Sequence, residues 1–254
     1  MSLPKILHTD AVVLRAIDFS ETSRIVTLFT REKGKMGVMA KGARAAKSRF
    51  GSTLEPMNQI STVIHCKAGR ELQILSEASH VKHHYILRSS IERMETGLRI
   101  IELVNALMQN DETNERVYGL LVASLYALEE APGRTANLWP FFQLKMASLL
   151  GFEPTFEKDE VNAIGSSDAV LDLNSGRISL VAEPGYVSVS ASRKTLRAFA
   201  ILARAELSDI MRMELDVETA AGVGHLVASY LRHHVDDQYP SRSARVFAQL
   251  SAGS

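Results

Sequence analysis

The sequence has a single cysteine, Cys66, and only 6% aromatic residues. One thiol excludes an internal disulfide and a cysteine-rich zinc site, so a reducing compartment fits best. Residues 1–10 lack the apolar stretch of a secretory signal, and no segment approaches the roughly 18 apolar residues of a membrane helix. We therefore expect a cytoplasmic protein that does not enter a membrane.

An excess of charge of either sign is also missing, since the net charge is zero. This balance alone argues against a strongly basic nucleic-acid binder. The two ends of the chain nevertheless differ. Residues 1–80 hold 12 Lys and Arg against 7 Asp and Glu, whereas the remainder holds 17 against 22. The N-terminal part is therefore basic, and the rest is acidic.

The first 80 residues are typical of short strands. Their runs are rich in Val, Ile and Thr, partly alternate between apolar and polar residues, and are separated by polar or glycine-containing turns. Five such runs cover residues 11–17, 23–30, 35–41, 59–66 and 71–78. Five strands in this length predict a small antiparallel barrel with an OB-fold.

From about Tyr85 the apolar period becomes helical, and the pattern predicts helices around residues 100–108, 117–128 and 138–149. Asp111 or Thr113 is the expected cap of the second helix. Residues 151–190 are expected to form an irregular insertion with a turn at residues 174–176. Helical pattern returns at 196–203, 223–231 and 241–250. The prediction is an α+β chain with a barrel domain at 1–80 and a helical domain at 81–254.

A dense group of cations lies within the barrel segment. Seven occur in nineteen residues, opposed only by Glu32: Arg31, Lys33, Lys35, Lys41, Arg44, Lys47 and Arg49. Glycines punctuate the same stretch, which predicts a hairpin leading into a mobile loop with cationic side chains that reach outward. Such a surface follows a phosphate backbone without reading its sequence. The alternative is an edge strand whose charges protect it from aggregation.

Aromatic residues are scarce in the same 80 residues, where only Phe19, Phe29 and Phe50 occur. A protein that neutralises phosphates and leaves base faces free is better suited to pairing two strands than to sequestering one. The alternative is that all three rings pack in the core, in which case they say nothing about bases.

The segment TLFTREKGKMGVMAKGARAAKSRF resembles the RecO family, in which AKGAR is followed by a basic loop. The segments AVVLRAIDFSETSRIV, LEPM, LLGFEP and YLRHHVDDQYPSRSARVFAQL fall in that family's order. The resemblance implies a non-enzymatic recombination mediator in DNA repair. Such a protein binds single-stranded and double-stranded DNA, anneals strands, and works with RecR, SSB, sometimes RecF, and indirectly RecA. It implies no cofactor, and the chain has no GxxxxGK[ST] loop for a nucleotide.

The chain departs from many members of that family in the zinc region. Glu157, Lys158 and Asp159 stand where paired cysteines would begin, so we expect no metal site there. The resemblance also points to the helix at 138–149 as the receiver of the SSB tail. Arg134, Phe142 and Lys145 are the candidate residues, because an acidic and apolar tail needs an apolar groove with cations at its rim. The alternative is ordinary core packing with one exposed lysine.

Two further functions stay open at this level. Clustered acids such as Asp111, Glu112 and Glu115, or Asp236 and Asp237, suit a metal-dependent nuclease if they converge. Their positions at predicted helix ends favour capping instead. Histidines at 80, 83 and 84 raise a similar question about a metal. A protein-binding adaptor is the other alternative.

Overall fold

The computed structural model describes residues 5–131, 135–157 and 168–240. The chain forms two compact units, one reaching to Glu130 and one running from Ala131 to Ser241. The first unit holds the strands of the barrel together with the three helices that follow them, whereas the sequence predicted a boundary near residue 80. None of the helices in the described ranges is long and apolar enough to cross a bilayer.

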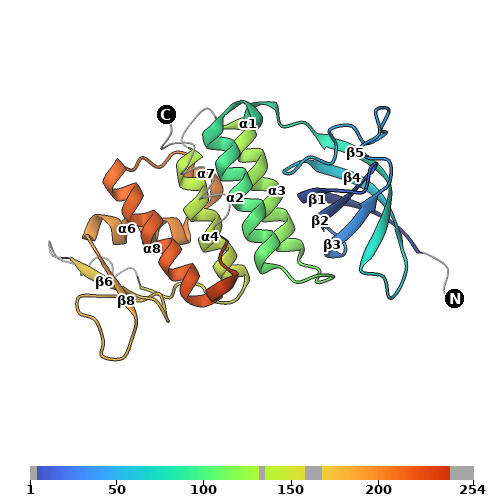
Figure 1. Cartoon of the computed structure of the whole chain (residues 1–254). Helices are drawn as coiled ribbons and strands as arrows, with labels where there is room; N and C mark the ends of the chain where they lie inside the picture. The colour runs from blue at the N-terminus through green and yellow to red at the C-terminus, as the bar shows by residue number, and fades with distance from the viewer. Residues whose placement is uncertain (1–4, 132–134, 158–167, 241–254) are drawn as a thin grey trace. The chain divides into compact units, whose positions relative to one another are not determined.

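Five strands form the closed barrel that the sequence predicted (Figure 1). They are β1 (Lys5–Phe19), β2 (Ser23–Thr30), β3 (Gly34–Ala40), β4 (Gln59–Cys66) and β5 (Leu72–Lys82). Their order around the barrel is β1-β2-β3-β5-β4, and β3 and β5 are parallel while the other pairs are antiparallel. This five-stranded arrangement is the expected OB-fold.

Strand β1 closes the barrel by serving two neighbours. Its first half, Lys5 to Val12, pairs with β4, and its second half, Ala11 to Phe19, pairs with β2. The β1–β2 register shifts between Val13 and Arg15, which is the signature of a bulge. A bulge bends a strand and increases its twist, so β1 turns from one neighbour to the other at this point.

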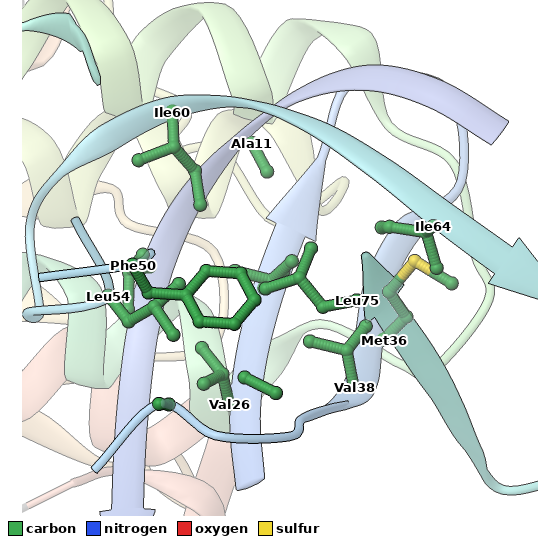
Figure 2. Close-up of a cluster of buried hydrophobic side chains, with 13 residues drawn as sticks. Ala11, Val26, Met36, Val38, Phe50, Leu54, Ile60, Ile64 and Leu75 are labelled. Carbon is green, nitrogen blue, oxygen red and sulfur yellow. The ribbon is translucent and has the colours of Figure 1, made fainter. Parts of the chain in front are cut away.

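Alternate residues of the strands fill the barrel with aliphatic side chains (Figure 2). Val26, Val38 and Leu75 face this interior, and Phe50 and Leu54 enter it from the segment that joins β3 to β4. Phe50 lies across the middle of the cluster in Figure 2. Burial of each such side chain contributes about 1.5–3 kcal/mol to stability. The interior is therefore packed, and ligands can reach only the outside of the barrel and its ends.

Three helices complete the first unit: α1 (Tyr85–Ser89), α2 (Ile91–Leu107) and α3 (Glu115–Glu130). The predicted stripe of Ile100, Leu103, Val104, Leu107 and Met108 is buried, as its spacing indicated. The expected cap of α3 was wrong. The side chain of Asn114, rather than Asp111 or Thr113, accepts a hydrogen bond from the backbone N–H of Val117.

A buried carboxylate holds the start of α1. Glu129, on α3, accepts hydrogen bonds from the backbone N–H groups of Tyr85, Ile86 and Leu87. Burial opposes the charge of Glu129, but these three donors outweigh it and lower the pKa of the carboxyl group. Glu129 therefore acts as an N-terminal cap supplied from another helix, and it joins α3 to the start of α1.

The second unit is built on α4 (Leu138–Leu149), α6 (Arg193–Arg204) and α8 (Val217–Val235). The short elements η1 (Thr135–Asn137), α7 (Leu207–Ile210) and η2 (Asp236–Gln238) connect or end them. Phe142, Phe199 and Tyr230 are buried in this unit. The sequence predicted all three long helices. The predicted final helix at 241–250 lies outside the described residues.

The described part of the expected irregular insertion, residues 151–157 and 168–190, contains more regular structure than its composition indicated. It contributes β6 (Ala169–Asp172), β7 (Ile178–Ser179) and the start of β8 (Ser188–Ala191), which form a sheet in the order β7-β6-β8. The predicted turn at 174–176 is confirmed. Asp172 accepts hydrogen bonds from the backbone and hydroxyl of Ser175, and Gly176 adopts a φ of 72°.

Candidate nucleic-acid interface

The seven cations of the predicted DNA-binding segment lie at two ends of one strand. Arg31 and Lys33 are in the turn before β3, Lys35 is near its start, and the other four follow its end at Ala40. Six steps of about 3.3 Å separate Gly34 from Ala40, so the two groups are about 20 Å apart along the strand. They form two cationic sites rather than one continuous surface.

We call the cations after β3 the loop group; they are Lys41, Arg44, Lys47 and Arg49, and all four are exposed. Their segment was expected to be a mobile loop. In the structure it is a series of hydrogen-bonded turns whose residue Phe50 is anchored in the barrel core, and its mobility stays a prediction. Its cations are therefore displayed on a framework that is fastened to the barrel.

Arg44 is the member of the loop group that holds the framework in place. Its guanidinium donates to the backbone carbonyl of Ser20 at 2.7 Å and lies 3.2 Å from Asp18. Its backbone N–H also donates to the carbonyl of Thr22. These contacts tie the segment to the turn between β1 and β2. The charge of Arg44 is thus partly satisfied within the protein.

Lys41 and Lys47 have no ion pair with any described residue, and the guanidinium of Arg49 lies 5.0 Å from the centre of the Phe50 ring. A cation over an aromatic face keeps its outer donors available. Lys41, Lys47 and Arg49 are therefore the three side chains of the loop group whose charges are exposed and not paired with a carboxylate of the described residues.

We call Arg31, Lys33 and Lys35 the turn group, and two of them are engaged inside the protein. Arg31 pairs with Glu115 of α3 at 2.8 Å. The sequence predicted that Lys35 reaches outward, but its side chain turns toward the helices. Its partly buried ammonium group donates to the backbone carbonyl of Asn105 at 2.7 Å, and burial lowers its pKa. Only Lys33 is exposed without an ion pair among the described residues.

The turn group is fixed because the loop between α2 and α3 packs against it. The backbone N–H of Asp111 donates to the carbonyl of Lys35, and the hydroxyl of Thr113 donates to the carbonyl of Glu32. Gly34, with a φ of 64°, leaves no room for a side chain, because a Cβ there would lie 1.9 Å from the carbonyl oxygen of Glu112. The cationic turn and the helical pair therefore form one structure.

An apolar stripe crosses the outer face of the barrel between the two groups. The register places Ile17 opposite Ile25, Ile25 opposite Met39, and Met39 opposite Ile74. Their sequence neighbours Val26, Val38 and Leu75 fill the core, so these four side chains point outward. All four are at least partly exposed, Ile17 to 40%. The stripe runs across β1, β2, β3 and β5.

The stripe was not predicted from the sequence, although its four apolar residues lie within the predicted strands. Outward positions of a barrel strand are usually polar, and apolar residues at such positions mark a surface with a partner. Recognising them requires the register between strands, which the sequence does not state. Arg15 lies one outward position from Ile17 and is also exposed, so it adds a cation beside the stripe.

The three phenylalanines of the barrel divide between core and surface. Phe29 and Phe50 are buried, which confirms core packing for these two. Phe19 is 46% exposed at the end of β1. The described barrel thus exposes one aromatic ring, whereas a face that stacks successive bases needs several.

The described residues that were expected to receive an SSB tail have little exposed surface. Phe142 has no exposed surface, which fits the alternative of ordinary core packing at this position. Lys145 is partly buried, with its ammonium nitrogen 5.4 Å from the centre of the Phe141 ring. Arg134 lies outside the described residues. Lys145 is the candidate that retains some exposure.

The described residues contain no group of three or more His, Cys, Asp and Glu side chains that could hold a metal ion. The rings of His80 and His83 lie 4.1 Å apart, and that of His83 stacks on Tyr85 at 5.4 Å. Of the acids considered for a nuclease, Glu115 pairs with Arg31.

Two family models match the chain, and they divide it near residue 85, close to the boundary that the sequence predicted at residue 80. Residues 1–84 match the family model described as Recombination protein O N terminal, and residues 88–243 match Recombination protein O C terminal. The DNA repair protein RecO of Salinibacter ruber is 44% identical, over 98% of this chain and 96% of its own length. The RecO proteins of Chlorobium limicola and Chloroherpeton thalassium are 32% and 30% identical over 96% of this chain. The chain therefore belongs to the RecO family.

Proposed function

We propose that this chain is a cytoplasmic recombination mediator in DNA repair that binds single-stranded DNA and anneals complementary strands. Its relatives are named as DNA repair proteins, and the matched family is named for recombination. Together with RecR, the protein helps to load RecA onto DNA that is coated with SSB. The mechanism requires binding and release of strands and no chemical step or cofactor.

The observation that carries this proposal is the surface formed by the loop group and the apolar stripe. Lys41, Lys47 and Arg49 present charges that phosphates attract, and this attraction does not depend on base identity. The stripe beside them is aliphatic, so bases that rest on it lack the stacking energy of about 1–3 kcal/mol that an aromatic ring supplies. A strand is therefore held by its backbone, while its bases stay available to a complementary strand or to a duplex.

The partners follow from the family and are part of the proposal. RecR and the C-terminal tail of SSB bind directly, RecF joins in some organisms, and RecA is affected indirectly. For the SSB tail, Lys145 on α4 is the candidate cation, because the residue is only partly buried and lies beside Phe141. An acidic tail would pair with this charge.

The central experiment measures annealing of complementary labelled strands by the purified full chain, with magnesium and without nucleotide. We expect duplex of full length. Shortened products would instead indicate a nuclease, and a failure to bind strands would favour a protein-binding adaptor. The variant Lys41→Ala/Lys47→Ala/Arg49→Ala should anneal slowly, whereas Arg116→Ala/Arg197→Ala, which removes exposed cations from α3 and α6, should anneal like the unmodified protein.

A second experiment repeats the assay on strands coated with SSB. Lys145→Glu should slow annealing of coated strands and leave naked strands unaffected, because its charge would repel the acidic tail. Equal rates on coated strands for the variant and the unmodified chain would remove Lys145 from the proposal and leave the DNA-binding surface untouched.

A further inference from the structure

A cavity of about 380 Å³ opens at the end of the barrel opposite the loop group. Three lysines from three separate segments line it: Lys5 from β1, Lys33 from the turn before β3, and Lys67 after β4. Leu7 and Met36 contribute an apolar wall, and Cys66 also lines the cavity. The cavity lies wholly within the first unit of the chain.

Backbone contacts fix the three segments that carry the lysines. Lys5 pairs with Cys66 across the β1–β4 ladder. The side chain of Gln73 accepts from the backbone N–H of Lys67 at 2.7 Å and donates to the carbonyl of Arg70, which closes the turn between β4 and β5. The backbone N–H of Lys33 donates to the hydroxyl of Thr30. The backbone positions of the three lysines are therefore set before any ligand arrives.

The cavity carries uncompensated positive charge. Among the described residues, Asp111 is the one acidic side chain on its wall, and none forms an ion pair with Lys5, Lys33 or Lys67. Burial raises the pKa of the Cys66 thiol, while Lys33 and Lys5 act in the opposite direction. Lys5 is also the direct partner of Cys66 in the β1–β4 ladder. Three cations held around a partly enclosed space attract an anion of more than one charge.

We propose that this cavity binds a terminal phosphate, the phosphomonoester at the end of a DNA strand. A phosphomonoester carries a charge of about −1.5 to −2 at neutral pH, which suits three lysines opposed by one aspartate better than a single charge does. An end can enter a cavity, whereas an internal phosphate continues in two directions and needs an open groove. The apolar wall of Leu7 and Met36 would contact the terminal sugar or base.

This inference rests on the proposed binding of DNA and adds a preference for strand ends. It places the end of a strand about 20 Å from the loop group along β3. A free mononucleotide offers the same phosphomonoester, so it is the other source of the ligand. The experiment below separates these two sources from each other and from DNA binding in general.

The first measurement compares the affinity of the full chain for oligonucleotides of one sequence with a 5′-phosphate, a 3′-phosphate or hydroxyls at both ends. We expect one phosphorylated form to bind about tenfold more tightly, because charge-assisted hydrogen bonds form only with the phosphomonoester. The variant Lys5→Ala/Lys67→Ala should abolish this preference and keep the affinity for the hydroxyl form. The matched variant Lys41→Ala/Lys47→Ala should weaken all forms and keep the preference.

The second measurement uses Cys66, which is the only thiol in the chain. N-ethylmaleimide is neutral, so its reaction with Cys66 reports access to the cavity. The phosphorylated oligonucleotide should slow this reaction several-fold, whereas the hydroxyl form should not. A nucleoside monophosphate that protects Cys66 equally well at the same concentration would identify the free nucleotide as the ligand source.

Equal affinity for all three oligonucleotides, together with unchanged maleimide reaction in every arm, would overturn the cavity as a phosphate site. A preference that survives Lys5→Ala/Lys67→Ala would do the same. A chain that binds no oligonucleotide would contradict the proposed function, and protection of Cys66 by a nucleoside monophosphate would then still support the cavity.

Discussion

The ammonium nitrogen of Lys35 lies 2.7 Å from the backbone carbonyl oxygen of Asn105, which ties the start of β3 to the last turns of α2. A lysine from the most basic segment of the chain thus serves the packing of the barrel against its helices. A charged donor to a buried carbonyl contributes about 1.5–3 kcal/mol, which is more than an exposed lysine provides.

Replacing Lys35 should therefore affect stability and leave DNA binding intact. We expect Lys35→Met to lower the free energy of unfolding by about 1.5–3 kcal/mol, measured by urea denaturation, because the carbonyl of Asn105 loses its donor. Lys33→Met, two residues away and exposed, is the control and should change it by less than about 0.5 kcal/mol. A large drop in DNA affinity for folded Lys35→Met would show that this ammonium group reaches phosphates after all.

The salt dependence of binding should identify the phosphate contacts. Each cation that neutralises a phosphate of a single strand contributes about −0.7 to the slope of log affinity against log salt. Lys41→Ala/Lys47→Ala/Arg49→Ala should therefore make the slope shallower by about 2. Removing the exposed Arg116, Lys194 and Arg197 should leave the slope unchanged. The same slope for both triple variants would place the interface elsewhere.

The absence of aromatic residues from the stripe can be tested by adding one. Met39→Phe places a ring on the outer face between Ile25 and Ile74. We expect tighter binding of single strands, by up to about 1–3 kcal/mol for the base that stacks, and slower annealing because that base is held. Met39→Leu keeps the surface aliphatic and serves as the control. Faster or unchanged annealing with tighter binding would refute the idea that weakly held bases favour pairing.

Glu129 should make the stability of the first unit sensitive to acid. Its pKa is lowered in the folded chain, so its contribution is present above the unfolded value of about 4.3 and is lost as the pH falls through the folded pKa. Glu129→Gln should lower the free energy of unfolding by about 1.5–3 kcal/mol at pH 7. The difference in free energy of unfolding between the variant and the unmodified chain should become smaller below about pH 4. If the difference in free energy of unfolding did not change with pH, the charge of the carboxylate would contribute nothing to stability.

The purified chain should contain no stoichiometric zinc. Its only thiol, Cys66, lines the barrel cavity, so a cluster of thiolate ligands cannot form elsewhere in the chain. Glu157, Lys158 and Asp159 stand in the region considered above for a zinc site. Elemental analysis after dialysis against a chelator is the measurement. One zinc per chain would require a histidine and carboxylate site.

Much of the fold followed from local pattern. Strands β2 and β4 and helix α4 were predicted at their observed bounds, because alternation and helical spacing are properties of neighbouring residues. The cap of α3 was missed, since Asp111, Thr113 and Asn114 are all capable of capping and only the backbone geometry selects one. The sheet formed by β6, β7 and β8 was missed because strands of two to four residues leave almost no period to detect.

The candidate site was predictable in composition and much less so in arrangement. The sequence identified the cations, but Lys35 and Lys41 lie at opposite ends of β3. Only the folded barrel shows that Lys35 contacts Asn105 whereas Lys41 is exposed. The stripe of Ile17, Ile25, Met39 and Ile74 draws on four strands. Such a set depends on pairing between distant residues, and a linear pattern does not contain that information.

The two-sided pairing of β1 also bears on how the chain folds. Strands β1, β2 and β3 pair with their neighbours in sequence, so they can form early, whereas pairing of β1 with β4 joins Lys5 to Cys66 and must wait for the intervening residues. The segment between β3 and β4, which carries the loop group, is part of these intervening residues. Its length therefore sets part of the entropy that is lost when the barrel closes. Selection on that segment for folding speed and selection for DNA binding would then act on the same residues. Shortening it would accelerate closure at the expense of the cations it carries.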